Sequence, residues 1–172
     1  MPLLTPAEFG ALWDTFQHTA FKLEVRDQYL VDSEQESLRR FLAGESDPGR
    51  ATRPWLAKMK AATGAGKRVE RVRVVSEPHS DYVRWLLAGN PLNVAAGEDI
   101  RYLARPRAAE LCLPRHDFAL FDSSTVVLLN FDDEDRPRQH ELVTDPGVVV
   151  QHCRWRDAAW HYAVPYSRYV AE

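Results

Sequence analysis

The chain has few of the features that mark secreted, membrane-bound or nucleic-acid-binding proteins. It contains only two cysteines in 172 residues, Cys112 and Cys153, and they match no metal-ligand spacing. Its longest apolar runs, around 126–129 and 148–150, are far shorter than the roughly 20 residues that a membrane-spanning helix needs. The formal net charge is −3, whereas a protein that holds nucleic acid by bulk electrostatics needs a basic surface.

These shortages indicate a reduced cytoplasmic protein. Nothing at the N-terminus joins a charged region to an apolar run, as a secretory signal would, and we expect no membrane segment. Two separate cysteines in such a chain are expected to stay reduced. Direct nucleic-acid binding is the least favoured function. A composition that is 45% hydrophobic and 27% charged fits a single globular domain over residues 1–172.

The segment 71–101 reads as a strand, a polar turn, a helix, a loop and a second strand. A β-branched run at 72–75 precedes Ser80, which is a good N-cap, and residues 82–87 then supply an apolar helical face. A new strand begins near Ile100. This order predicts a βαβ unit whose polar turn is a natural place for a binding site.

The residues before this unit predict a helix, a strand and two further helices, in that order. Thr5 to Glu8 forms a capping box with proline at the first helical position. Apolar residues alternate with Lys22, Glu24 and Arg26, which predicts a half-buried strand over 20–29. A second capping box at 33–36 starts a short helix. The other expected elements are a loop over 44–54, a helix from Pro54 to the Gly64 and Gly66 break, and a strand over 69–75.

The residues after Pro114 favour β-structure followed by one long helix. Short apolar runs at 118–121, 125–131 and 139–143 are separated by polar turns, which predicts an antiparallel meander. Asp145 and Pro146 then open a helix that ends before Pro165. The whole pattern predicts an α/β or α+β domain with a mixed sheet of about six strands and packed helices.

Five aromatic residues lie on apolar faces at the period of their own elements, so we expect them mainly in the core. They are Trp13, Phe16, Phe21, Trp55 and Trp160.

No complete catalytic or metal motif is present. None of the six histidines has HxxxH spacing with a third ligand nearby, and the acidic run 132–135 lacks the spacing of a calcium loop. His116 and Asp117 are adjacent, but neighbouring strand residues face opposite ways, so a structural role is favoured. We therefore expect no metal and no cofactor.

One group of polar residues is the best candidate for a ligand- or partner-binding site. The strand-end turn and the entry to the next strand carry unlike charges that could hold an anion or a partner's side chain. The plain alternative is helix capping and salt bridges. The candidate residues are His79, Asp81, Arg84, Glu98, Asp99 and Arg101.

Several phrases of the chain resemble an uncharacterised actinobacterial family, a domain of unknown function often encoded beside helix-turn-helix regulators. The matching blocks, which extend over nearly the whole chain, are 16–29, 71–85, 96–103, 116–122 and 154–165. This resemblance implies a regulatory context without supplying a mechanism.

The order of elements also resembles, more distantly, the phospholipase D-like domains attached to bacterial regulators. The phrase FALFD at 118–122, the following VVLL strand and a last helix with Trp160 carry this likeness. Active members use an HxK motif, and no histidine here is followed two residues later by lysine. The resemblance therefore implies a half-domain scaffold without the catalytic motif, kept for binding or sensing.

The leading functional hypothesis is a non-enzymatic regulatory or protein-interaction module of the cytoplasm. Its partner would be a protein, with a helix-turn-helix regulator as the candidate, and a homodimer is compatible with the sequence. The alternative is an enzyme or sensor that binds a small phosphorylated or nucleotide-like ligand at the turn after strand 69–75, with His79 or His116 as acid or base.

Overall fold

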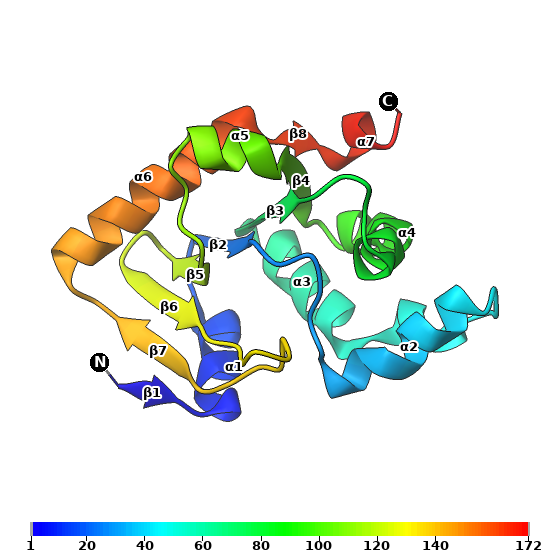
Figure 1. Ribbon diagram of the computed structural model, residues 1–172. Helices are drawn as coiled ribbons and strands as arrows, with labels where there is room; N and C mark the ends of the chain where they lie inside the picture. The colour runs from blue at the N-terminus through cyan, green and yellow to red at the C-terminus, as the bar shows by residue number, and fades with distance from the viewer. Residues whose placement is uncertain (1, 172) are drawn as a thin grey trace.

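The computed structural model describes residues 2–171 as an eight-stranded mixed sheet with seven α-helices and one 3-10 helix (Figure 1). The strands are β1 (Leu3–Leu4), β2 (Thr19–Glu24), β3 (Arg68–Val75), β4 (Asp99–Ala104), β5 (Asp117–Phe121), β6 (Thr125–Leu129), β7 (His140–Val143) and β8 (Val164–Pro165). The helices are α1 (Pro6–Thr15), α2 (Asp32–Leu42), η1 (Pro48–Thr52), α3 (Pro54–Gly64), α4 (Asp81–Ala95), α5 (Arg105–Glu110), α6 (Pro146–Tyr162) and α7 (Tyr166–Tyr169).

The sheet joins a parallel half to an antiparallel half, in the order β1-β7-β6-β5-β2-β3-β4-β8. Strands β2, β3 and β4 run parallel, and β5, β6 and β7 form the antiparallel meander. The predicted βαβ unit and the predicted meander are therefore confirmed. The expected count of about six strands is corrected to eight, because β1 and β8 are two-residue strands at the two edges.

Local capping signals place several helix starts. The Thr5 box caps α1, and the side chains of Ser80 and Asp145 cap α4 and α6, as expected. The predicted capping box at 33–36 is wrong. Helix α2 starts at Asp32 after Val31, which has no side-chain cap, so two acidic residues in the first turn face the helix dipole instead.

Helix α4 is longer than its apolar face suggested, because it continues through Pro91 to Ala95. Proline has no N–H to bond the carbonyl of Leu87, four residues earlier. The hydroxyl of Tyr166 donates a hydrogen bond to that carbonyl at 3.3 Å and so replaces the missing partner. Helices α5 and α7 were not expected, and β2 ends at Glu24, short of the predicted 29.

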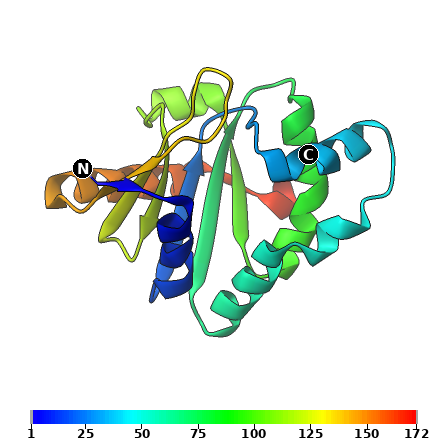
Figure 2. The ribbon, with the colours of Figure 1, turned by 90° about the horizontal axis from the view of Figure 1, so that it is seen from below.

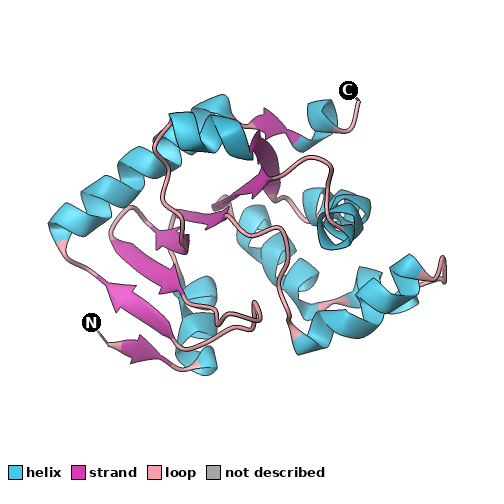
Figure 3. Ribbon diagram, viewed as in Figure 1, coloured by secondary structure: helices cyan, strands magenta, loops and turns pink. Residues whose placement is uncertain are grey.

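Helices cover both faces of the sheet (Figure 3). Helices α5 and α6 pack over one face on a core that includes Phe21, Val72 and Phe118. Helices α1, α3 and α4 cover the other face, and α2 packs against α4 (Figure 2). The core thus has two layers, one on each side of β2 and β3.

The expected aromatic core is confirmed for Trp13, Phe16 and Phe21, which are buried. Trp55 and Trp160 pack against the core but stay partly exposed. The largest fully buried side chain is Trp85 on α4, which the sequence reading did not single out.

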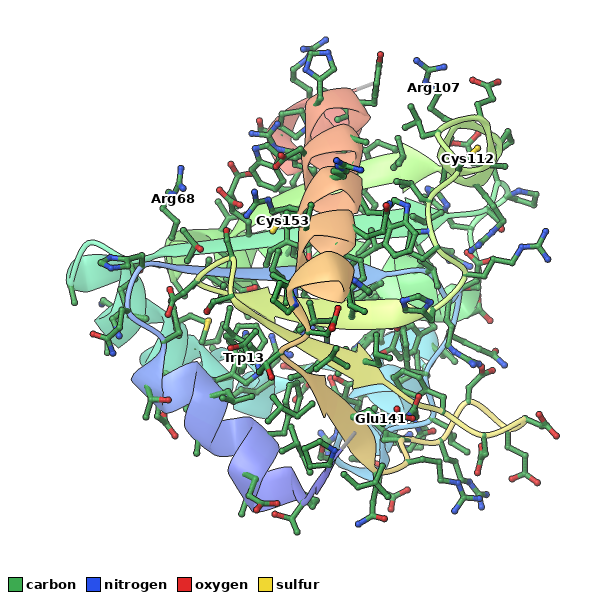
Figure 4. All side chains as sticks on the ribbon, turned by 90° about the vertical axis from the view of Figure 1, so that its left-hand side faces the viewer. Trp13, Arg68, Arg107, Cys112, Glu141 and Cys153 are labelled. Carbon is green, nitrogen blue, oxygen red and sulfur yellow. The ribbon has the colours of Figure 1, made fainter. Side chains whose placement is uncertain are left out.

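The two cysteines are free thiols in separate places. Cys153 lies on α6 and is partly buried, whereas Cys112 is exposed just after α5 (Figure 4). Within residues 2–171, no helix has the length and apolar character that crossing a bilayer would need.

Two histidines meet at the edge of the α6 layer. The Nε2 atoms of His116 and His152 lie 3.2 Å apart, and Nδ1 of His152 is 2.8 Å from the carbonyl of Val148. Because a carbonyl only accepts, Nδ1 of His152 donates, and its Nε2 accepts the proton of His116. The His152 ring is therefore held neutral, with its Nε2 lone pair facing His116.

This pair should make the folded protein sensitive to acid. Burial lowers the pKa of His152, and burial together with repulsion from a protonated His152 lowers the pKa of His116. The unfolded chain then takes up protons first, so the free energy of unfolding should fall as the pH drops below about 6.5. The substitution His152→Phe should make that decline shallower in urea melts.

The parent must be compared with His152→Phe because Asp117 has the opposite effect on the free energy of unfolding as the pH falls. Burial raises the pKa of Asp117 to about 6, so the folded state takes up this proton before the unfolded chain does. If His152→Phe declined as steeply as the parent, the acid sensitivity would come from other groups.

Candidate ligand-binding cleft

The structure places the six predicted site residues in separate environments. The ring of His79 bridges the Ser76 carbonyl, at 2.9 Å, and the Tyr169 hydroxyl, at 2.8 Å. Asp81 and Arg84 form an exposed ion pair of 2.9 Å in the first turn of α4. Both features agree with capping and surface pairing, and a role in partner binding stays a prediction.

The other three predicted residues lie at the opposite end of α4. Asp99 and Arg101 pair at 3.3 Å at the start of β4, where the Arg101 guanidinium lies 3.6 Å from the centre of the Trp160 ring. Glu98 is buried and faces a different set of partners. The structure therefore does not bring the six residues together, and only Glu98 takes part in a larger polar cluster.

That cluster is built on the two central parallel strands. Lys22 and Glu24 of β2 are in register with Arg71 and Arg73 of β3. Since side chains alternate along a strand, these four residues share the face that α3 and α4 cover, while Val72 and Val74 face α6. A row of charges thus lies beneath a helical layer.

Glu24 is the centre of this charged network. Its carboxylate accepts hydrogen bonds from Nη1 of Arg71 at 2.5 Å and from Nε of Arg73 at 2.7 Å. The Lys22 ammonium lies 3.1 Å away. Burial alone would raise the pKa of Glu24, but the charges of Arg71, Lys22 and Arg73 lower it well below its ordinary value.

Glu98 closes the network from the α4–β4 connection. It accepts hydrogen bonds from Arg71 at 3.1 Å, from the Trp55 indole at 2.5 Å and from the Asn93 amide at 2.7 Å. On the other side of the network, Nη1 of Arg73 donates to Asn90 at 2.9 Å and to the Tyr102 hydroxyl at 3.1 Å. Each buried carboxylate therefore has several donors, as buried charges require.

A cleft of about 460 Å³ opens over this network, between the sheet and helices α2, α3 and α4. It adjoins a second pocket of about 170 Å³, because both are lined by Lys22, Glu34, Arg71, Arg73 and Leu86. The second pocket adds the rings of Tyr29, Tyr82 and Phe131. The size and mixed lining are typical of sites for small molecules.

Positive charge exceeds negative charge around the two pockets. Five cationic side chains face three carboxylates, those of Glu24, Glu34 and Glu98, so an excess of two positive charges remains. The cations are Lys22, Arg50, Arg53, Arg71 and Arg73. The protein as a whole carries −3, so this cleft differs in sign from the average surface.

Arg50 and Arg53 supply the unbalanced charge. No carboxylate among the described residues pairs with either guanidinium: Arg53 donates to the Asn93 side chain at 3.2 Å, and Arg50 donates to the carbonyl of Trp85. Burial and the charge of Arg53 lower the pKa of Arg50. Among the described residues, these two neighbouring cations have no directly paired carboxylate, although the charges of Asp47 and Glu34 act on Arg50.

The Arg50 side chain is seated against α4 by two features. Its guanidinium lies 4.8 Å from the centre of the Trp85 ring, a favourable cation–π contact. It also lies over Gly89, where an added Cβ would come within 2.6 Å of the Arg50 Cζ. Any larger residue at 89 would displace the guanidinium.

The sequence reading missed this cleft, although a signal for it was present. Strands inside a parallel sheet are buried on both faces and usually read as continuous apolar runs. The alternation in 68–75 puts Arg71 and Arg73 on one face of such a strand, and the charges of β2 match them. Charges at alternate positions of interior parallel strands therefore indicate a buried polar site.

The lining favours binding of an anion over binding of a metal. Guanidinium and ammonium groups donate to phosphate or carboxylate and cannot ligate a cation. Within the described part of the chain, no three histidine, cysteine or acidic side chains gather as a metal ion would need.

The comparisons with known proteins give a family and no activity. The chain matches a domain of unknown function, DUF6879, over residues 7–171. No curated protein matches it. Since the match covers nearly the whole sequence, the chain belongs to the DUF6879 family of domains of unknown function.

Proposed function

We propose that this protein is a non-enzymatic sensor module that binds a small organic anion in the cleft over Glu24, Arg71 and Arg73. The observation that carries the proposal is the excess of two positive charges in a concave, partly buried site. Charge-assisted hydrogen bonds from guanidinium groups are among the strongest that proteins make, and a cleft of this size holds a metabolite.

The regulatory part of the proposal concerns the contact between α2 and α4. Helix α2 is tied to α4 across the cleft by the Trp85 indole, which donates to Ser37 at 3.1 Å, and by the Tyr82 hydroxyl, which donates to Glu34 at 2.5 Å. An anion beside Glu34 and Arg50 would change the charge balance at this contact. We propose that a protein partner binds differently to the two charge states of this contact, with a helix-turn-helix regulator as the candidate. We also propose that the protein works in the cytoplasm.

The exposed Asp81–Arg84 pair at the start of α4 is the proposed contact for that partner. It lies on the same helix as Trp85, Gly89 and Asn90, which line the cleft. A phospholipase D-like origin of the scaffold, with the HxK motif lost, is part of the same proposal and would explain a phosphate-sized site without turnover.

A binding screen tests the proposal. Isothermal titration with inorganic phosphate, sulfate, succinate and adenosine monophosphate should detect binding of at least one of these anions. Incubation with adenosine monophosphate or a phosphodiester should leave both unchanged, because binding without chemistry is proposed. Hydrolysis that disappears in His79→Ala or His116→Ala, with folding retained, would favour the enzyme alternative.

The matched control compares two arginines of one strand. Arg73→Gln removes a charge beneath the cleft, whereas Arg68→Gln removes one from the exposed start of β3, where the side chain points away from the sheet (Figure 4). Binding should be lost in the first variant and kept in the second. Equal affinity in both variants would place the ligand elsewhere.

A further inference from the structure

We infer that the ligand of this cleft carries a phosphate monoester, held as a dianion between Arg50 and Arg53. This inference rests on the proposed function, because it names the chemical class of the anion that the cleft takes. It goes further in assigning the two guanidinium groups that receive the phosphate and the pocket that receives the rest of the ligand.

The charge of the site matches a dianion. Glu24 and Glu98 already engage Arg71 and Arg73, and Lys22 pairs with Glu24. Arg50 and Arg53 have no carboxylate partner within the described chain. A phosphate ester, with a charge of about −1.5 to −2 at neutral pH, would balance these two cations. A single carboxylate would neutralise only one of them.

Guanidinium N–H groups without a hydrogen-bond partner favour a ligand that has several acceptor oxygens. Nε of Arg50 and Nε of Arg71 are buried, and neither has a hydrogen-bond partner among the described residues. A phosphate offers three acceptor oxygens, and the guanidinium fork binds such a group through two parallel bonds.

The neighbouring pocket has room for the organic part. Its walls combine Tyr29, Tyr82 and Phe131 with Leu86, which it shares with the main cleft. Together the two spaces exceed what a bare phosphate ion needs, and the aromatic end suits a compact ring. A phosphate monoester of small size, with its head at Arg50 and Arg53, therefore fits the site.

Titration of the ligand itself gives a test that depends on charge. Phenyl phosphate loses its second proton near pH 6, whereas sulfate stays a dianion throughout. Affinity for phenyl phosphate, measured by calorimetry and tryptophan fluorescence, should fall about tenfold from about pH 7.5 to pH 5, in step with the dianion fraction. Affinity for sulfate should change much less, which corrects for titration of the protein.

Three variants locate the phosphate. Arg50→Gln and Arg53→Gln should each weaken phenyl phosphate binding by at least about tenfold, as loss of a charge-assisted hydrogen bond does. Gly89→Ala keeps every charge but displaces the Arg50 guanidinium, so it should weaken binding comparably. The exposed Arg68→Gln should bind as the parent does. Thermal melts confirm that each variant is folded.

The outcomes separate this inference from the proposed function. If benzoate binds as tightly as phenyl phosphate, and Arg50→Gln and Arg53→Gln weaken both, the cleft takes anions but the phosphate class is wrong. If no anion binds in a way that depends on Arg50, Arg53 or Arg73, both proposals are overturned. Unchanged phenyl phosphate affinity across the pH range would also overturn the dianion.

Discussion

Replacing Glu24 by alanine should lower the free energy of unfolding by about 3 to 5 kcal/mol, the usual cost of breaking a buried ion pair from one side. The variant leaves Arg71 and Arg73 charged and buried, since each is less than a tenth exposed. Urea unfolding followed by circular dichroism measures the loss. Glu24→Gln, which keeps the shape and part of the hydrogen bonding, should fall between the parent and the alanine variant.

A surface carboxylate provides the control for this result. Glu36 on α2 bonds Arg39 and Arg40, but its side chain is 60% exposed. Glu36→Ala should therefore change the free energy of unfolding by less than about 1 kcal/mol. If Glu24→Ala were equally mild, the network would be hydrated in solution, and the cleft would be wider than the structure indicates.

The Glu24 carboxylate should also affect how steeply the free energy of unfolding falls at acidic pH. Because neighbouring cations hold the pKa of Glu24 well below its ordinary value, its contribution is present above about pH 4.3 and is lost as the pH falls further. The alanine variant lacks this contribution at every pH. Below about pH 4.3, the free energy of unfolding of the alanine variant should consequently fall less steeply with pH than that of the parent.

Replacing Trp13 by alanine should lower the free energy of unfolding by about 3 to 5 kcal/mol, as emptying a large buried site does. Trp13 is 5% exposed and meets Trp55 and Phe121 edge-on, with ring centres 4.9 Å apart in both cases. It joins α1 to the sheet and to α3. Chemical unfolding of the variant measures the effect directly.

Tyr162 is the matched aromatic control. It is 45% exposed at the end of α6, where the Arg107 guanidinium lies 4.3 Å from its ring centre. Tyr162→Ala should change the free energy of unfolding by less than about 1 kcal/mol. A Trp13→Ala variant as stable as Tyr162→Ala would mean that α1 packs less firmly on the sheet than its contacts indicate.

The predictable part of the fold came from local signals. The cap at Ser80 and the prolines at 6, 54 and 146 mark helix starts by chemistry that acts within a few residues. The meander was predictable because its strands follow one another through short polar turns. Strands β1 and β8 were not, since two residues carry no period and only pairing with β7 and β4 makes them strands.

The candidate site was harder to predict because it depends on which layer covers which face. Lys22 and Glu24 read as the solvent side of a half-buried strand, but α3 and α4 cover that side. Arg50 and Arg53 belong to a segment that reads only as a loop, and the α4 packing gives them a place at the cleft. Of the six residues expected in one site, Glu98 alone joins it, through Arg71 and Asn93.

The position of β2 in the sheet has a consequence for synthesis of the chain on the ribosome. In the sheet, β2 pairs with β3, which follows about 45 residues later in the chain, and with β5, which follows about 95 residues later. The side chain of Asp122, just after β5, also accepts hydrogen bonds from the backbone N–H groups of residues 17–19, where β2 begins. Until β5 emerges, one side of β2 is an open edge that could pair with other nascent chains. A polypeptide that ends before residue 117 would therefore be prone to aggregate. The hairpin of β5 and β6 removes this risk, because β5 pairs with the open edge of β2.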